Sequence, residues 1–180
     1  KIYNQLIMKI AIYGPMCSGK TTVAKIIQEY NDEYKIYSFG QKIKDLALEL
    51  FDMKDKNRSL LIAIGSKMRE INPDVWAEYI VKQTEGKENC IIDDLRFQNE
   101  LNHLDGWKII CLTTSTDERI KRLKQMYPEN YQDHISNMGH LSETDTLQLP
   151  EDTIYMDTAI PMDELKRKVG AFITYPLFNQ

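Results

Sequence analysis

The sequence predicts an α/β fold with three layers, in which helices cover both faces of a parallel sheet of about five strands. Short apolar runs alternate along the chain with segments whose apolar residues recur at helical spacing. The first apolar run ends in a glycine-containing turn that leads directly into a helix. The length of 180 residues fits one domain, so we expect a single unit over residues 1–180.

Each predicted strand is a short apolar run bounded by turn or helix signals. The predicted strands are residues 8–13, 35–39, 89–92, 107–113 and 153–156. Amphipathic spacing predicts helices at residues 20–30, 41–51, 57–70, 97–104, 117–126 and 162–173, and another after the break at 72–74. In such a sheet, ligands bind at the carboxyl ends of the strands.

Composition and charge limit the binding partners and the cellular location that we expect. The net charge of −4 provides no basic field, which predicts neither a nucleic-acid partner nor binding to an anionic membrane. No apolar stretch approaches the roughly 18 residues of a transmembrane helix, and no signal-peptide pattern is seen. Cys17, Cys90 and Cys111 lack metal-binding spacing and are odd in number, which favours a reducing, cytoplasmic location.

The segment GPMCSGKT, at positions 14–21, has the spacing of a phosphate-binding loop after a strand and before a helix. Inward-turned N–H groups and the positive end of the helix can surround phosphate oxygens, which predicts binding of a nucleoside triphosphate. Lys20 is expected at the β- and γ-phosphates and the Thr21 hydroxyl at Mg²⁺. The predicted nucleotide-binding residues here are Gly14, Cys17, Ser18, Gly19, Lys20, Thr21 and Thr22.

Two carboxylates, Asp93 and Asp94, follow the apolar run of the third predicted strand. A carboxylate at this edge can hold water ligands of Mg²⁺ or accept a proton from an attacking phosphate or hydroxyl. One of the two can instead cap the helix that starts near Phe97. We favour a functional role for the pair, with Asp94 ahead of Asp93.

Three basic side chains, Lys44, Arg69 and Arg96, are candidates for binding an anionic acceptor. Taken singly, each is more typical of a solvated surface charge. Beside a phosphate loop and an acidic strand end, they form a set that can hold an anion, the arginines through bidentate contacts.

The helix at 117–126 is basic and precedes a long polar segment without sustained periodicity, which includes His134 and His140. Arg119 and Arg122 lie on this helix. A closing lid would supply cations to a transferring phosphate in this way, and residues of about 116–150 are the candidate lid. A helix with a solvated basic face explains the same pattern equally well.

Several motifs resemble those of the deoxynucleoside monophosphate kinases of phage and large-virus type, and they cover most of the chain. The most specific is DLRFQNE at 94–100, which is similar to the family's DVRFPNE. FGQKIK at 39–44 is similar to FAxxLK, and GSKMR at 65–69 to GxxxR. NPDVW at 72–76 is similar to PDxW, and HLSE at 140–143 to HxSE.

The resemblance implies a P-loop kinase fold with a helical acceptor-binding region at about 40–85, ATP and Mg²⁺ as cofactors, and a deoxynucleoside monophosphate (dNMP) as acceptor. Trp76 is implied to wall the base pocket, although a core position is commoner for tryptophan. The implied catalytic residues are Lys20, Asp94, Arg96 and Arg122, with Thr21 and Asp94 at the metal and Arg119 at the donor nucleotide. The implied acceptor-binding residues are Lys44, Arg69, Trp76, Asp93, Arg96 and Glu143.

Two rivals stay open at this point. One is a kinase of another small phosphorylated acceptor, similar to phosphomevalonate kinases, although their Arg-rich motif is not matched by RFQN at 96–99. The other is a non-catalytic switch that binds a nucleoside triphosphate. The sequence also leaves open the preferred base, the sugar, a homodimeric state, a host-cytoplasm location for a viral source, and which lid cation meets the γ-phosphate.

Overall fold

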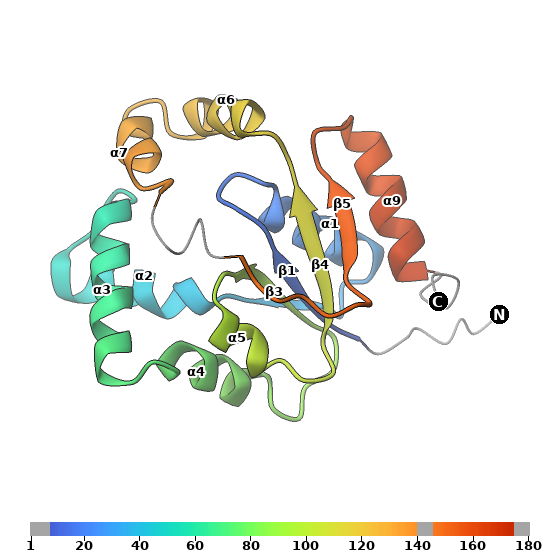
Figure 1. Cartoon of the computed structure of the whole chain (residues 1–180), viewed down its shortest axis with the longest axis horizontal. Coiled ribbons are helices and arrows are strands. Elements are labelled where there is room, and N and C mark those ends of the chain that lie inside the picture. Colours follow the sequence, from blue (N-terminus) through green and yellow to red (C-terminus); the bar gives the residue numbers. More distant parts are fainter. Residues whose placement is uncertain (1–7, 140–145, 175–180) are drawn as a thin grey trace.

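The computed structural model describes residues 8–139 and 146–174 (Figure 1). Its centre is a five-stranded parallel sheet with the strand order β2-β3-β1-β4-β5. The strands are β1 Lys9–Tyr13, β2 Lys35–Tyr37, β3 Cys90–Leu95, β4 Lys108–Thr113 and β5 Ile154–Asp157. The fold class and strand number predicted from the sequence are confirmed. Within the described residues, no helix is both long and apolar enough to cross a membrane.

Helices cover both faces of this sheet and connect its strands (Figure 1). They are α1 Lys20–Tyr30, α2 Phe39–Phe51, α3 Arg58–Ile71, α4 Val75–Thr84, α5 Gln98–Asn102, α6 Thr116–Met126, α7 Tyr131–Ser136 and α9 Met162–Thr174. The helices α1 and α9 pack against one face, and α2 to α5 pack against the other.

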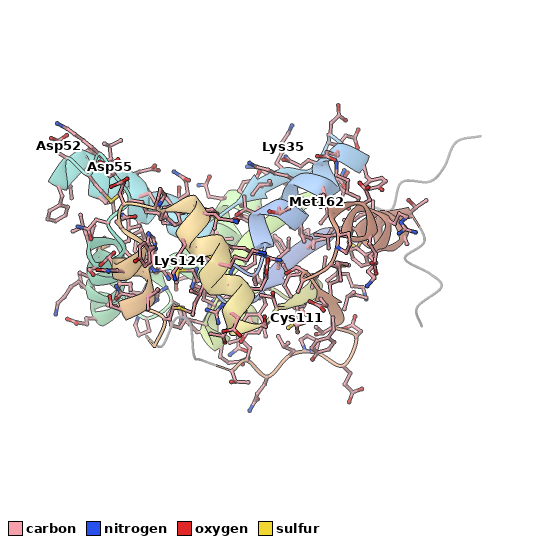
Figure 2. The ribbon with its side chains drawn as sticks, turned by 90° about the horizontal axis from the view of Figure 1, so that it is seen from above. Lys35, Asp52, Asp55, Cys111, Lys124 and Met162 are labelled. Carbon is pink, nitrogen blue, oxygen red and sulfur yellow. The ribbon has the colours of Figure 1, made fainter. Side chains whose placement is uncertain are left out.

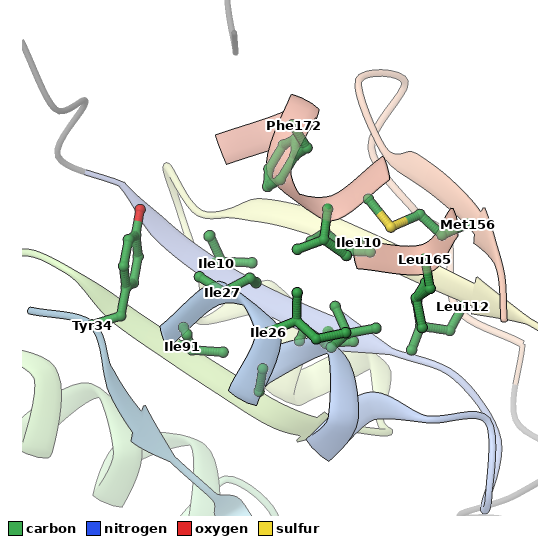
Figure 3. Close-up of a cluster of buried hydrophobic side chains, with 14 of the residues drawn as sticks. Ile10, Ile26, Ile27, Tyr34, Ile91, Ile110, Leu112, Met156, Leu165 and Phe172 are labelled. Carbon is green, nitrogen blue, oxygen red and sulfur yellow. The ribbon is translucent and has the colours of Figure 1, made fainter. Parts of the chain in front are cut away.

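Alternation along the strands sorts the apolar side chains into two cores. On β1, Ile10 and Ile12 belong to the core under α1 and α9, whereas Ala11 between them belongs to the core under α2 to α5. On β3, Ile91 and Ile92 divide in the same way. Figure 3 shows the first core, where the labelled strand residues face the isoleucines of α1 and the C-terminal helix.

Two elements differ from the prediction. The third strand, expected to run from residue 89 into Asp93 and Asp94 at its carboxyl end, continues one residue further to Leu95. A short helix, α7, occupies part of the segment that shows no sequence periodicity. It lies against the start of α3, where Asp133 accepts hydrogen bonds from the Arg58 N–H (3.1 Å) and the Ser59 hydroxyl (2.8 Å). Tertiary contacts, rather than an amphipathic stripe, therefore hold this helix.

Candidate active site

The phosphate-binding loop connects β1 to α1, and its backbone requires glycine at two positions. Gly19 has a φ of +94°, which side-chain-bearing residues rarely adopt. A Cβ at Gly14 would lie 2.7 Å from the Ser18 oxygen, which is too close. The Lys20 ammonium lies inside the loop and donates to the carbonyls of Gly14 (2.6 Å) and Pro15 (2.8 Å). The first turn of α1 thus presents backbone N–H groups and a buried cation to one small space.

Asp93 faces this loop from the neighbouring strand β3. Its Oδ2 accepts a hydrogen bond of 2.8 Å from the Thr21 hydroxyl. Burial, and next the charge of Asp94, raise the pKa of Asp93, whereas the Thr21 hydroxyl, Lys44 and Lys20 act in the opposite direction. A hydroxyl and a carboxylate held side by side next to a phosphate loop fit the oxygen ligands that Mg²⁺ prefers.

Asp94 points away from the loop, because successive side chains on a strand alternate. Its Oδ1 accepts from the Phe39 N–H, and its Oδ2 accepts from the Gly40 N–H and the Ser38 hydroxyl, all at 2.8 Å. Asp94 therefore caps the N-terminus of α2. The sequence placed Asp94 ahead of Asp93 at the metal, whereas in the structure Asp93 is the carboxylate that contacts Thr21. The capping alternative named the helix near Phe97, but the helix that Asp94 caps is α2.

One cavity of about 500 Å³ joins the phosphate loop to the helices on the α2 side of the sheet. The loop contributes Lys20 and Thr21, α2 contributes Lys44, and α3 contributes Arg69. The further predicted residues that line the cavity are Cys17, Gly19, Thr22, Asp93, Asp94, Arg96 and Arg122. The structure thus brings residues from distant parts of the sequence to a single space.

Arg69 is held in this cavity by a carboxylate that the sequence reasoning did not select. Its Nη2 donates to Oε1 of Glu100 (3.2 Å), and its guanidinium lies over the Phe97 ring at 4.2 Å. Burial lowers the pKa of Arg69, and Glu100 opposes that shift. A signal for Glu100 exists in the sequence, because a glutamate three residues after a helix N-cap commonly bonds back to the cap.

The basic helix α6 lies beside the phosphate loop, where its arginines contact the loop backbone. Arg119 Nε donates to the Met16 carbonyl (2.7 Å), and Arg122 Nη1 donates to the Cys17 carbonyl (3.3 Å). Figure 2 shows α6, with Lys124 labelled, between the helices of the α2–α3 side and α1. Arg122 lines the cavity, whereas Arg119 is absent from the described lining. The interpretation of α6 as only a solvated basic face is wrong for these two arginines.

A threonine after β5 completes the wall behind the loop. Thr158 donates from its hydroxyl to the Ser18 carbonyl (2.7 Å), and it accepts from Arg122 through the hydroxyl (3.1 Å) and the carbonyl (2.7 Å). Ile160 and Met162 continue the lining along this segment. No sequence pattern singles out these residues, because their position depends on the packing of β5 at the edge of the sheet.

Residues after α6 contact the acceptor-side helices. Lys56, which lines the cavity, donates to the Tyr127 hydroxyl (3.0 Å), and Asn130 donates to the Lys56 carbonyl (3.0 Å). The His134 ring stacks on Tyr127 with centroids 4.2 Å apart. Burial is the main cause that lowers the pKa of His134. The candidate lid therefore spans from the phosphate loop, at Arg122, to the start of α3.

One predicted acceptor residue, Trp76, lies outside the cavity lining. Trp76 is 3% exposed, packs in the core under α2 to α5, and donates from Nε1 to the Gly65 carbonyl (3.2 Å). The prediction that it walls the base pocket is corrected, because this packing joins α4 to α3 instead. Glu143 and the HLSE motif at 140–143 lie outside the described residues.

The parallel α/β fold and the loop between β1 and α1 have the architecture of P-loop proteins. The family model described as "AAA domain" matches residues 10–140, and the chain belongs to this family. No curated protein matches the sequence.

Solved structures of kinases share the fold over nearly the whole chain. A gluconokinase from Sinorhizobium meliloti 1021 is 16% identical, with a TM-score of 0.58 and coverage of 94% of this chain and 93% of that one. A shikimate kinase from Acinetobacter baumannii, in complex with shikimate, is 13% identical, with a TM-score of 0.57 and 97% coverage of both chains. A shikimate kinase from Aquifex aeolicus vf5 is 15% identical, with a TM-score of 0.59 and coverage of 96% and 100%.

Proposed function

We propose that the protein is an ATP-dependent deoxynucleoside monophosphate kinase, which converts ATP and a dNMP to ADP and a dNDP. The observation that carries this proposal is the single cavity that joins the phosphate loop to Lys44, Arg69 and Arg96. A kinase with two substrates must bind the phosphate donor and the acceptor in one cavity, because phosphoryl transfer depends on positioning and charge stabilisation rather than on a protein nucleophile.

The donor half would be formed by the loop and β3. Lys20 would turn from the loop carbonyls to the β- and γ-phosphates of ATP, and Thr21 with Asp93 would hold Mg²⁺. Bound Mg²⁺ would neutralise charge on the phosphates. Arg122 is the lid cation nearest this half, since it lines the cavity and bonds to the loop.

The acceptor half would bind the monophosphate through Arg69, Arg96 and Lys44. An oxygen of that phosphate would attack the γ-phosphorus in line, and the bond from the γ-phosphorus to its bridging oxygen would break as ADP leaves. Contact of the lid with Lys56 would restrict water in the cavity during transfer.

One segment of the chain supports a dNMP as acceptor, through its position and through its sequence. The DLRFQNE segment at 94–100 places Arg96 and Glu100 at the cavity, and this segment is the most specific part of the resemblance to dNMP kinases. The competing acceptor is a small carboxylate, because gluconokinase and shikimate kinase share the fold and arginine binds carboxylates as well as phosphates.

A coupled assay of ADP release tests the proposal, with the four common dNMPs, the four NMPs, phosphomevalonate, shikimate and gluconate as acceptors. We expect turnover with at least one dNMP and a loss of about 100-fold or more in kcat/KM for Arg69→Ala, since a charged contact to the acceptor is removed. Turnover of phosphomevalonate, shikimate or gluconate without turnover of any dNMP would contradict the proposal. Unchanged ATP consumption in Arg69→Ala would instead favour a nucleotide switch.

A further inference from the structure

Glu100 lines the cavity beside Arg69 and accepts three hydrogen bonds, which connect two separate parts of the cavity lining. The residue is 2% exposed, although it is a carboxylate. Its Oε2 accepts from the N–H groups of Arg96 (2.9 Å) and Phe97 (3.0 Å), and its Oε1 accepts from Arg69 (3.2 Å). A single side chain therefore links the end of α3 to the turn between β3 and α5.

The Arg69 guanidinium is confined on its other sides as well. The Phe97 ring lies 4.2 Å from its centre. A Cβ at Gly65, one turn earlier on α3, would lie 3.3 Å from Nη1, so glycine leaves the space that the guanidinium occupies. An arginine side chain in water samples many rotamers, and this enclosure reduces that number before any acceptor binds.

We propose that Glu100 is a positioning residue that sets the direction of the Arg69 guanidinium and of the Arg96–Phe97 backbone for binding an anionic acceptor group. It would act through Arg69 and would not contact the reacting atoms. The proposal rests on the proposed function for its kinetic consequence, but the contact between the two side chains can be tested without any substrate.

The charges around Glu100 are consistent with this role. Burial, and then Asp94, raise its pKa to about 7, whereas Arg69 and the two backbone N–H groups act in the opposite direction. A buried carboxylate is costly without a partner, and the ion pair with Arg69 offsets part of that cost, although burial has the larger effect on the pKa of both groups. Loss of the negative charge would leave Arg69 held only by the Phe97 ring and its own helix.

The test compares Glu100→Gln, which keeps the shape but removes the charge, with Glu70→Gln as a matched control. Glu70 is next to Arg69 in sequence, but it is exposed and pairs only with Lys67 among the described residues. In ¹⁵N–¹H spectra, the guanidinium signals of Arg69 are assigned as those lost in Arg69→Lys. We expect Glu100→Gln to shift or broaden these signals and Glu70→Gln to leave them unchanged.

The kinetic part of the test uses the best acceptor found for the wild type. We expect Glu100→Gln to raise the KM for the acceptor about tenfold, while the KM for ATP changes less than about twofold. In Arg69→Ala, which removes the cation, the added Glu100→Gln change should raise the acceptor KM by a smaller factor than it does in the wild type, because the contact with Arg69 is already lost. Unchanged Arg69 signals in Glu100→Gln, equal changes in both KM values, or additive effects would overturn the proposal. Lack of turnover of any dNMP by the wild type would contradict the proposed function, and the spectra would still decide the role of Glu100.

Discussion

The adjacent aspartates Asp93 and Asp94 of β3 have different surroundings, and the sequence alone could not show which contacts each would make. Asp93 faces Thr21 at the phosphate loop, whereas Asp94 binds the first N–H groups of α2. The sequence predicted that both carboxylates belong to the site and preferred Asp94, but it did not take into account that alternation along β3 sends the two side chains to different neighbours.

This division predicts different results for two isosteric substitutions. Asp93→Asn should lower kcat by about 100-fold or more with little loss of stability, because it removes the charge that we propose to bind Mg²⁺. Asp94→Asn should lower the free energy of unfolding by about 1–2 kcal/mol, because a charged helix cap is weakened. Steady-state kinetics and urea denaturation of both variants check this. The opposite pattern would return the metal role to Asp94.

A second residue-scale prediction concerns the pH dependence of stability. The folded-state pKa of Glu100, about 7, lies above its ordinary value of 4.5, so the folded protein holds this proton more tightly than the unfolded chain. The stability contributed by Glu100 is therefore complete below about pH 4.5 and falls as the pH rises to about 7. The difference is on the order of 3 kcal/mol, at about 1.4 kcal/mol for each pKa unit.

Thermal unfolding of wild type and Glu100→Gln between pH 4.5 and pH 8 measures this difference. The Tm of Glu100→Gln relative to wild type should rise with pH, because glutamine carries no titrating proton. The other titrating groups contribute equally to the Tm of both proteins, so their contributions cancel in the Tm difference. A constant Tm difference across this range would contradict the assigned shift.

At the scale of elements, the contact between α1 and α9 depends on a glycine. Gly170 is buried in α9, and a Cβ there would lie 2.4 Å from the Tyr30 ring on α1. Tyr30 also donates to the Lys166 carbonyl (3.0 Å) across the same contact. The α9 helix covers the first core.

Gly170→Ala should lower the free energy of unfolding by about 1 kcal/mol or less, because the added methyl group displaces the partly exposed Tyr30 ring while alanine favours the helix. Gly139→Ala is the control, since a Cβ there meets nothing within 4 Å. The second change Tyr30→Ala should recover part of the loss. Equal stability of both alanine variants in urea denaturation would contradict this account of the α1–α9 contact.

For the whole molecule, local sequence patterns were enough to predict the sheet, whereas the features that these patterns missed depend on tertiary contacts. The central strands β1, β3 and β4 were predicted because each is a largely buried apolar run, whereas the edge strands β2 and β5 are partly exposed and were predicted from shorter apolar or alternating patterns. The phosphate loop was predicted because its spacing is fixed by phosphate geometry. The short helix α7 was missed because contacts of Asp133 with α3 hold it. Thr158 was missed because nothing local marks it, and Trp76 was misassigned because core and pocket tryptophans look alike in sequence.

The proposed function requires that a phosphoryl group passes between two nucleotides bound in the two parts of the cavity. The most direct measurement is ³¹P NMR of the wild-type protein with ATP, Mg²⁺ and the four common dNMPs in turn. The account predicts new α- and β-phosphate signals of a dNDP, equal in amount to the ADP formed, and their absence with Lys20→Ala. Release of inorganic phosphate without any dNDP, or no reaction with every dNMP, would contradict it.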